Sequence, residues 1–164
     1  MKRKKEHYFE RIEEAPGPLV VDIRRRVRFS EVDPLAIVWH GRYSSFFEEG
    51  AEELGRLCGL SYKDFYEAGL RAPIVKLHID YFKPLRLAEE FTIRTALIWD
   101  TSSRLNTEYY LLKDDGSTAT SGYTVQVFTF ASSGEVCLVS PEILVRCRKR
   151  WAAGEFNKGG GAGE

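Results

Sequence analysis

Residues 29–50 decide the fold, and they read Phe29-Ser-Glu-Val-Asp33-Pro-Leu-Ala-Ile-Val-Trp-His40-Gly-Arg-Tyr43-Ser-Ser-Phe-Phe-Glu-Glu-Gly50. The stretch leaves a strand, passes through a loop that carries an acid, and enters an amphipathic helix. Asp33 precedes Pro34, which biases Asp33 away from helical backbone angles and stiffens the loop. Because residues 35–39 are apolar, we expect this loop to pack inward.

His40 and Gly41 open the predicted helix, where backbone N–H groups are unpaired and the helix dipole is positive. A carboxylate near such amides can attack a carbonyl that they polarise, or activate water against it. Asp33 therefore has two interpretations, a reacting acid or an ordinary Asx-turn or N-cap residue. His40 also has two, since either its imidazole or its backbone N–H could be the useful group.

The predicted helix covers residues 40–58 and carries an apolar stripe at steps of three to four residues. Gly50 lies within that stripe, where glycine costs about 1 kcal/mol relative to alanine. We therefore expect the helix to lie very close to a sheet at this point. The stripe consists of Tyr43, Phe46, Phe47, Gly50, Ala51, Leu54, Leu57 and Cys58.

The rest of the chain alternates in the manner of strands. An earlier strand is expected over residues 19–29, where Arg25 interrupts the apolar face and suggests an exposed end. Gly59 and Ser61 are expected to cap the two sides of a helix–helix junction. The sequence predicts a short helix at 62–68, strands at 72–82, 90–99, 104–113 and 118–131, a short strand through 139, and a last helix with Pro141 at its first position.

This order predicts an α+β fold in which one antiparallel sheet curls around the long helix and buries its stripe. The length of 164 residues fits one domain. We assign that domain to residues 18–152. Residues 1–17 form a charged lead-in with a short helix expected at 6–14, and the glycine-rich residues 153–164 are expected to be disordered.

Composition excludes several classes of protein. Lys and Arg total 24, as do Asp and Glu, so a nucleic-acid binder is disfavoured. The three cysteines lack C-x-x-C spacing and the histidines are scattered, which argues against a disulfide framework or a metal site and favours the cytoplasm. No signal peptide and no apolar run of about 20 residues is present, so we expect no transmembrane segment.

Two motifs carry a resemblance to a known family. The first is Phe29-x-Glu31-x-Asp33-Pro-x-x-Ile37-Val38-Trp39-His40-x-x-Tyr43, followed by Phe46-Phe47-Glu48, and the second is Ile79-Asp80-Tyr81-x-Lys83-Pro84. With the element order, they make residues 19–140 resemble the hotdog fold. More narrowly, the chain is similar to the 4-hydroxybenzoyl-CoA thioesterase family, which includes short-chain acyl-CoA thioesterases linked to the Tol-Pal system.

The resemblance implies an acyl-CoA thioesterase that needs no cofactor beyond its substrate and works as a homodimer or homotetramer with active sites between subunits. It makes Asp33 the catalytic carboxylate, as general base or as nucleophile, and gives the oxyanion to amides at His40 and Gly41. Tyr43 is a core residue or part of the acyl pocket, and Val75 and Lys76 are expected to bind substrate. The basic end of the last helix, Lys76 and Arg104 compete for the coenzyme A phosphates.

Two departures from the family pattern concern backbone conformation. Ala36 stands where the family usually has glycine three residues after the acid, and Ala88-Glu89 replaces the commoner Gly-Asp. Alanine tolerates positive φ poorly, so Ala36 gives weight to a module that binds acyl-CoA without hydrolysing it. An enoyl-thioester hydratase or dehydratase is a further alternative within the fold.

Overall fold

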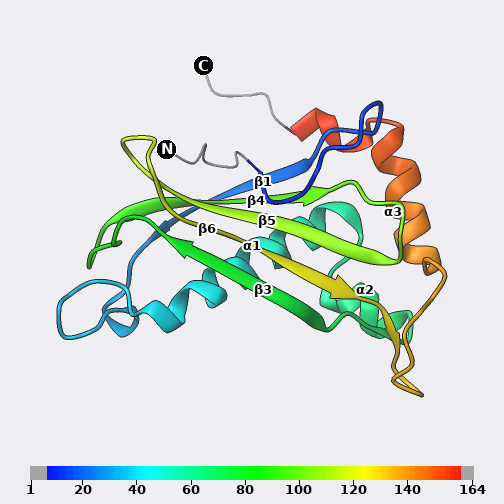
Figure 1. Ribbon diagram of the computed structural model, residues 1–164, viewed down its shortest axis with the longest axis horizontal. Coiled ribbons are helices and arrows are strands. Elements are labelled where there is room, and N and C mark those ends of the chain that lie inside the picture. The colour runs from blue at the N-terminus through cyan, green and yellow to red at the C-terminus, as the bar shows by residue number, and fades with distance from the viewer. Residues whose placement is uncertain (1–6, 160–164) are drawn as a thin grey trace.

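The protein is built around one antiparallel sheet wrapped over one long helix, as the computed structural model shows for residues 7–159 (Figure 1). The sheet has five strands in the order β1-β4-β5-β6-β3. Its strands are β1 (Leu19–Arg26), β3 (Ile74–Tyr81), β4 (Glu90–Ile98), β5 (Arg104–Lys113) and β6 (Thr118–Val127). The central helix, α1, spans Tyr43–Cys58. The predicted curled-sheet, α+β architecture is confirmed.

The core lies between α1 and the inner face of β1, β4 and β5. Phe47 stacks on Tyr109 with ring centroids 4.4 Å apart, and Phe46 packs against Phe91 at 5.2 Å. A Cβ on Gly50 would lie 1.9 Å from Thr95 Oγ1, so the predicted close approach of helix to sheet is confirmed. The stripe prediction fails at Leu57, which is 40% exposed.

The junction after α1 follows its sequence signals. Gly59 takes a left-handed φ of +76° as the helix C-cap. Ser61 caps α2 (Tyr62–Glu67) through a capping box with Asp64, because each side chain bonds the other's backbone N–H. Both expectations are confirmed.

Two boundaries near the decisive stretch differ from prediction. The strand expected over 19–29 ends at Arg26, and Phe29–Glu31 forms a 3-10 helix that leaves Phe29 82% exposed. The cause is Glu31, whose carboxylate accepts the Arg28 N–H and turns the chain out of the sheet. The helix expected from residue 40 begins with a separate 3-10 turn, His40–Arg42, before α1.

The C-terminal third also corrects the sequence interpretation. The long strand at 118–131 breaks into β6 and β7 (Thr129–Phe130), and β7 pairs with β2 (Leu70–Arg71). The short strand through 139 is wrong, because only a single bridge joins Thr129 to Val136. Pro141 is the N-cap of α3 (Glu142–Ala152) and not its first residue.

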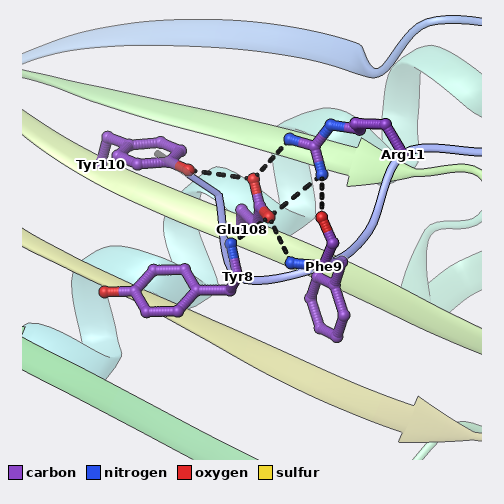
Figure 2. Close-up of polar contacts among 5 residues, drawn as sticks. All are labelled: Tyr8, Phe9, Arg11, Glu108 and Tyr110. Atoms are coloured by element: carbon purple, nitrogen blue, oxygen red, sulfur yellow. Dashed lines mark hydrogen bonds and ion pairs between the residues drawn. The ribbon is translucent and has the colours of Figure 1, made fainter. Parts of the chain in front are cut away.

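The N-terminal strap, which we define as residues 7–17, lies over the outer face of the sheet, opposite α1 (Figure 1). The helix expected at 6–14 does not form over the described residues, because the amides of Tyr8 and Phe9 donate to the buried carboxylate of Glu108 at 2.8 and 2.9 Å. Figure 2 shows Arg11 and Tyr110 donating to the same carboxylate. Residues 1–6 lie outside the described part of the chain.

The end of the chain is more ordered than expected. Residues Glu155–Gly159 form a 3-10 helix, and Phe156 packs against the core beneath the Arg150 guanidinium. The prediction of disorder from residue 153 is therefore wrong up to this point, because an aromatic side chain anchors the turn. Residues 160–164 lie outside the described residues. None of the helices formed by residues 7–159 has the length and apolar composition that a membrane crossing requires.

Candidate active site

The acid-bearing loop closes tightly on itself. Val32 bridges to Val38, and the Asp33 N–H donates to the Ile37 carbonyl at 2.9 Å. A turn inside this closure places the Ala36 N–H 3.0 Å from the Asp33 carbonyl oxygen. The loop therefore returns the chain to the side of Asp33 just before the start of the helix.

Asp33 is half-buried, and only one of its carboxylate oxygens is engaged. Oδ1 accepts the Leu35 N–H at 2.8 Å, which is the Asx-turn that one interpretation predicted. Within residues 7–159, no protein group donates to Oδ2. The turn and a reacting role are compatible, since the turn fixes the carboxylate while one oxygen stays open to substrate or water.

Glu31 and Arg25 anchor this loop to the central helix. The Arg25 guanidinium bonds the Glu31 carboxylate at 2.5 and 2.9 Å and reaches Glu49 on α1 at 2.9 Å. The Glu31 carbonyl accepts the Trp39 N–H at 2.9 Å, so the same residue also holds the far side of the loop. Burial acts to raise the pKa of Glu31, but the bonds from Arg25 and the Arg28 amide outweigh it and lower the pKa.

Arg25 corrects an expectation. The sequence suggested an exposed strand end there, yet its side chain is only 10% exposed. Its guanidinium lies 4.7 Å from the centroid of the Phe46 ring and is paired on both sides. The interruption of the apolar face was therefore the signal of a buried ion pair.

The helix start presents two unclaimed amides. The N–H groups of His40 and Gly41 donate to no protein acceptor within residues 7–159. The carbonyls of the same two peptide units are both held: Trp39 O accepts the Arg42 N–H at 2.9 Å, and His40 O accepts the Tyr81 hydroxyl at 2.8 Å. Two adjacent donors of fixed orientation are what an oxyanion site requires.

Trp39 shields this helix start. A Cβ on Gly41 would lie 2.3 Å from a Trp39 ring carbon, so the indole lies directly against the glycine. The exposed His40 imidazole lies beside the same indole, with ring centroids 5.1 Å apart. Glycine at 41 thus gives the indole room to cover the peptide that carries the free amide.

The other predicted residues are not gathered here within one chain. Tyr43 is buried between Phe46 and Tyr81, as its core interpretation has it, and burial raises its pKa. Val75 lies exposed at a bulge of the edge strand β3. The Lys76 Nζ lies 5.6 Å from the centroid of the Tyr123 ring, beside the strap rather than the loop.

The basic end of α3 is distant from this loop and largely engaged. Figure 1 places α3 at the opposite end of α1 from the loop at 29–42. Arg146 pairs with Glu142 and Arg150 with Glu155, while Arg148 donates to Ser102 O and Ser140 Oγ. Arg104, at the start of β5, remains exposed.

Tyr81 is the site residue to which the sequence assigned no role. It belongs to the second motif, but its partner lies 41 positions earlier in the chain. The tyrosine in that motif was a signal that its hydroxyl has a hydrogen-bond partner. Only the fold could reveal that its target is the helix start.

Both departures from the family pattern sit in left-handed backbone. Ala36 has φ of +59° and Ala88 has φ of +63°, so alanine takes the conformation expected of glycine at each position. The two segments meet, since the Leu87 N–H donates to the Ala36 carbonyl at 3.0 Å. The loop therefore keeps its shape at a local conformational cost.

Replacing Ala36 with glycine should stabilise the protein. The left-handed region costs an L-residue about 1–2 kcal/mol, and glycine gives back about 0.4–1 kcal/mol through its freer unfolded chain. We expect Ala36→Gly to raise the free energy of unfolding by about 0.5–1 kcal/mol in urea titrations. Ala51→Gly, within α1, is the control and should lower it. A loss for Ala36→Gly equal to that of Ala51→Gly would contradict this explanation.

A carboxylate held in the loop before a helix start with free amides, under a sheet wrapped over that helix, is an arrangement that can act on a thioester. Residues 27–147 match the thioesterase-like superfamily, and the chain belongs to that superfamily. The membership confirms the expected hotdog fold, and the superfamily's description agrees with the expected class, a thioester hydrolase. The match does not reach the narrower 4-hydroxybenzoyl-CoA group.

Individual relatives agree with this assignment. YneP of Bacillus subtilis, provisionally named an acyl-CoA thioesterase, is 35% identical over 69 residues, which are 42% of this chain and 50% of YneP. A provisionally named esterase of Aquifex aeolicus is 27% identical over 121 residues, 74% of this chain and 92% of that protein. A hypothetical protein of Staphylococcus aureus solved in complex with CoA superposes with a TM-score of 0.73 at 16% identity, covering 92% of this chain and 98% of that one. The alignment thus spans half the length of YneP.

Proposed function

We propose that this protein hydrolyses acyl-CoA thioesters to a free acid and coenzyme A. One observation carries the proposal: Asp33 keeps one carboxylate oxygen open in a loop that leads directly to two unclaimed N–H groups at His40 and Gly41. A thioester needs these two elements, an acid that attacks or activates water and donors for the oxygen that becomes negative. The names of YneP and of the CoA-bound relative support the same substrate class.

In the proposed reaction, the thioester carbonyl oxygen accepts hydrogen bonds from the His40 and Gly41 amides. In one route Asp33 removes a proton from the attacking water, the thiolate of coenzyme A leaves, and the free acid forms directly. In the other, Asp33 attacks the carbonyl carbon itself, the thiolate leaves, and water then hydrolyses the acyl–Asp33 anhydride to the free acid. The His40 side chain is exposed, so we assign the electrostatic work to its backbone. Losing one such donor typically lowers the rate about 10²–10³-fold.

We propose that Val75 and Lys76 act on the substrate across a subunit interface. Both lie on β3, an edge strand whose exposed side chains include Ile74, Val75 and Leu77. An apolar unpaired edge is an aggregation hazard unless something covers it. A second copy of this chain, in a homodimer or homotetramer, would cover it and bring these residues near the partner's loop.

A panel of acyl-CoA substrates with short, long and aromatic acyl groups tests the function. Thiol release, followed with a chromogenic thiol reagent, should appear with at least one member, and the likeness to short-chain thioesterases puts short acyl groups first. Loss of a 2-enoyl-CoA without thiol release would indicate a hydratase instead. Saturable binding without thiol release across the panel would indicate a non-catalytic module, and either outcome overturns the proposal.

A further inference from the structure

Tyr81 reaches the helix start from the last position of β3. Its hydroxyl donates to the His40 carbonyl oxygen at 2.8 Å. Its ring packs edge-on against Tyr43 with centroids 5.0 Å apart and planes at 87°. Burial raises the pKa of Tyr81, so the phenol stays a donor at neutral pH although the residue is 51% exposed.

The bond matters because of the peptide unit that it contacts. The His40 carbonyl and the Gly41 N–H belong to one planar group, so a donor that fixes the oxygen also fixes the direction of that N–H. Hydrogen bonds in a chain polarise one another by about 10–30% each. A carbonyl oxygen has two lone pairs, so it can accept from Tyr81 in addition to an amide of the helix.

The two candidate oxyanion donors are supported differently. The peptide that carries the His40 N–H is held at its carbonyl by Arg42 N–H, from within the same turn. The peptide that carries the Gly41 N–H is held by Tyr81, from the edge strand of the sheet. Trp39 closes the other side of Gly41, since its ring fills the space of a Cβ.

We infer that Tyr81 is a positioning residue for the oxyanion site: its hydroxyl orients and polarises the His40–Gly41 peptide so that the Gly41 N–H points at the thioester oxygen. The inference rests on the proposed hydrolysis of acyl-CoA and adds to it. Tyr81 itself contacts neither the acyl group nor coenzyme A in this role. It acts only through the peptide.

Tyr81→Phe tests this, because it keeps the ring against Tyr43 and removes only the donor. With the best substrate of the panel, kcat should fall about fivefold while KM stays unchanged, a fraction of the loss for a whole donor. Tyr66→Phe is the matched control, since Tyr66 is exposed on α2 and its hydroxyl bonds nothing in the described chain. Its kcat should equal that of the wild type.

A spectroscopic measurement separates positioning from general stability. In a coenzyme A ketone, a methylene separates the sulfur from the carbonyl. The analogue therefore keeps the carbonyl group but has no thioester bond to hydrolyse. Its infrared carbonyl stretch should move to lower frequency on binding to the wild type and should move less with Tyr81→Phe. Incorporating 3-fluorotyrosine at position 81, a stronger hydrogen-bond donor of nearly the same shape, should enlarge the shift of the carbonyl stretch. If Tyr81→Phe does not fold, this fluorinated variant provides the test of the positioning role.

The outcomes distinguish this inference from the proposed function. If the wild type releases thiol but Tyr81→Phe matches it in kcat and carbonyl shift, or differs only in KM, the positioning role is overturned and the hydrolase stands. If the fluorinated variant leaves the shift unchanged, the role is likewise overturned. If the wild type itself releases no thiol from any acyl-CoA, the proposed function fails first.

Discussion

Asp33→Asn is expected to lower kcat about 10²–10⁴-fold, the usual contribution of a positioned acid or base. The substitution removes the charge and the proton-accepting oxygen but keeps the loop. An asparagine Oδ1 can still accept the Leu35 N–H that closes the Asx-turn, so the free energy of unfolding should change little. Steady-state kinetics of thiol release together with urea unfolding measure both effects.

Asp115→Asn is the matched control for that experiment. Asp115 also accepts the amide two residues on, because its Oδ1 bonds the Ser117 N–H at 2.8 Å, but it lies in the β5–β6 hairpin. The same chemical change in the same kind of turn should leave kcat unaltered. Hydrolysis by Asp33→Asn at a rate near that of the wild type would refute the role of Asp33.

Glu108→Gln is expected to cause the largest loss of stability, about 2–3 kcal/mol, because hydrogen bonds to a buried charged group contribute about 1.5–3 kcal/mol. The carboxylate is 0% exposed and receives Tyr8 N–H, Phe9 N–H, two Arg11 nitrogens and the Tyr110 hydroxyl (Figure 2). Arg11 is 31% exposed and can turn to water, which limits the loss. Urea unfolding measures the difference, and proteolysis after Arg11 reports whether the strap has loosened.

The same variant makes a pH prediction. Burial acts to raise the pKa of Glu108, but the bonds from Arg11, the Phe9 amide and Tyr110 outweigh it and lower the pKa below 4.5. A carboxyl whose pKa falls on folding stabilises the protein above its unfolded pKa and loses that contribution as the pH drops through the folded value. The gap between wild type and Glu108→Gln should therefore be full at pH 7 and shrink below about pH 4.5.

Glu90→Gln is the control for Glu108. Glu90 pairs with Arg24 on the surface, where both side chains are about half exposed, and such pairs contribute about 0–1 kcal/mol. The loss of stability for Glu90→Gln at pH 7 should therefore be small. A Glu108→Gln variant that unfolds no more easily than Glu90→Gln would show that the strap is not held by this carboxylate.

Sequence patterns sufficed where local rules decide structure. The period of α1 and the caps at Gly59 and Ser61 are set by neighbours a few positions away, so they could be predicted. The close approach at Gly50 could be inferred from a glycine inside the helix stripe, but its contact, Thr95 on β4, could not. The loop that carries Asp33 was predicted only in part, because Pro34 constrains it as expected. The expected inward packing of residues 35–39 is wrong for most of them: Leu35 is 77% exposed and Trp39 47%, and only Val38 is buried. The open carboxylate oxygen and the free amides are consistent with the chemistry expected there.

Long-range contacts explain the rest. The strap is held by the carboxylate of Glu108, about a hundred positions away in the chain. No local pattern in residues 7–17 predicts this contact. The early end of β1 follows from Glu31, whose carboxylate bonds the Arg25 guanidinium and the Arg28 amide. From the sequence, Arg25 suggested only an exposed strand end. Tyr81 was visible as a motif residue, but its target was not.

The strap has a consequence for how copies of this protein can stack. It occupies the middle of the sheet's convex side, where Tyr8 and Phe9 lie over Glu108 and Tyr123. A second copy that approached this face would contact the strap before any strand. It would have to displace the strap from Glu108, whose side chain is fully buried. If copies associate as proposed, we therefore expect the contact at the edge strand β3 or on the side of the sheet that carries α1.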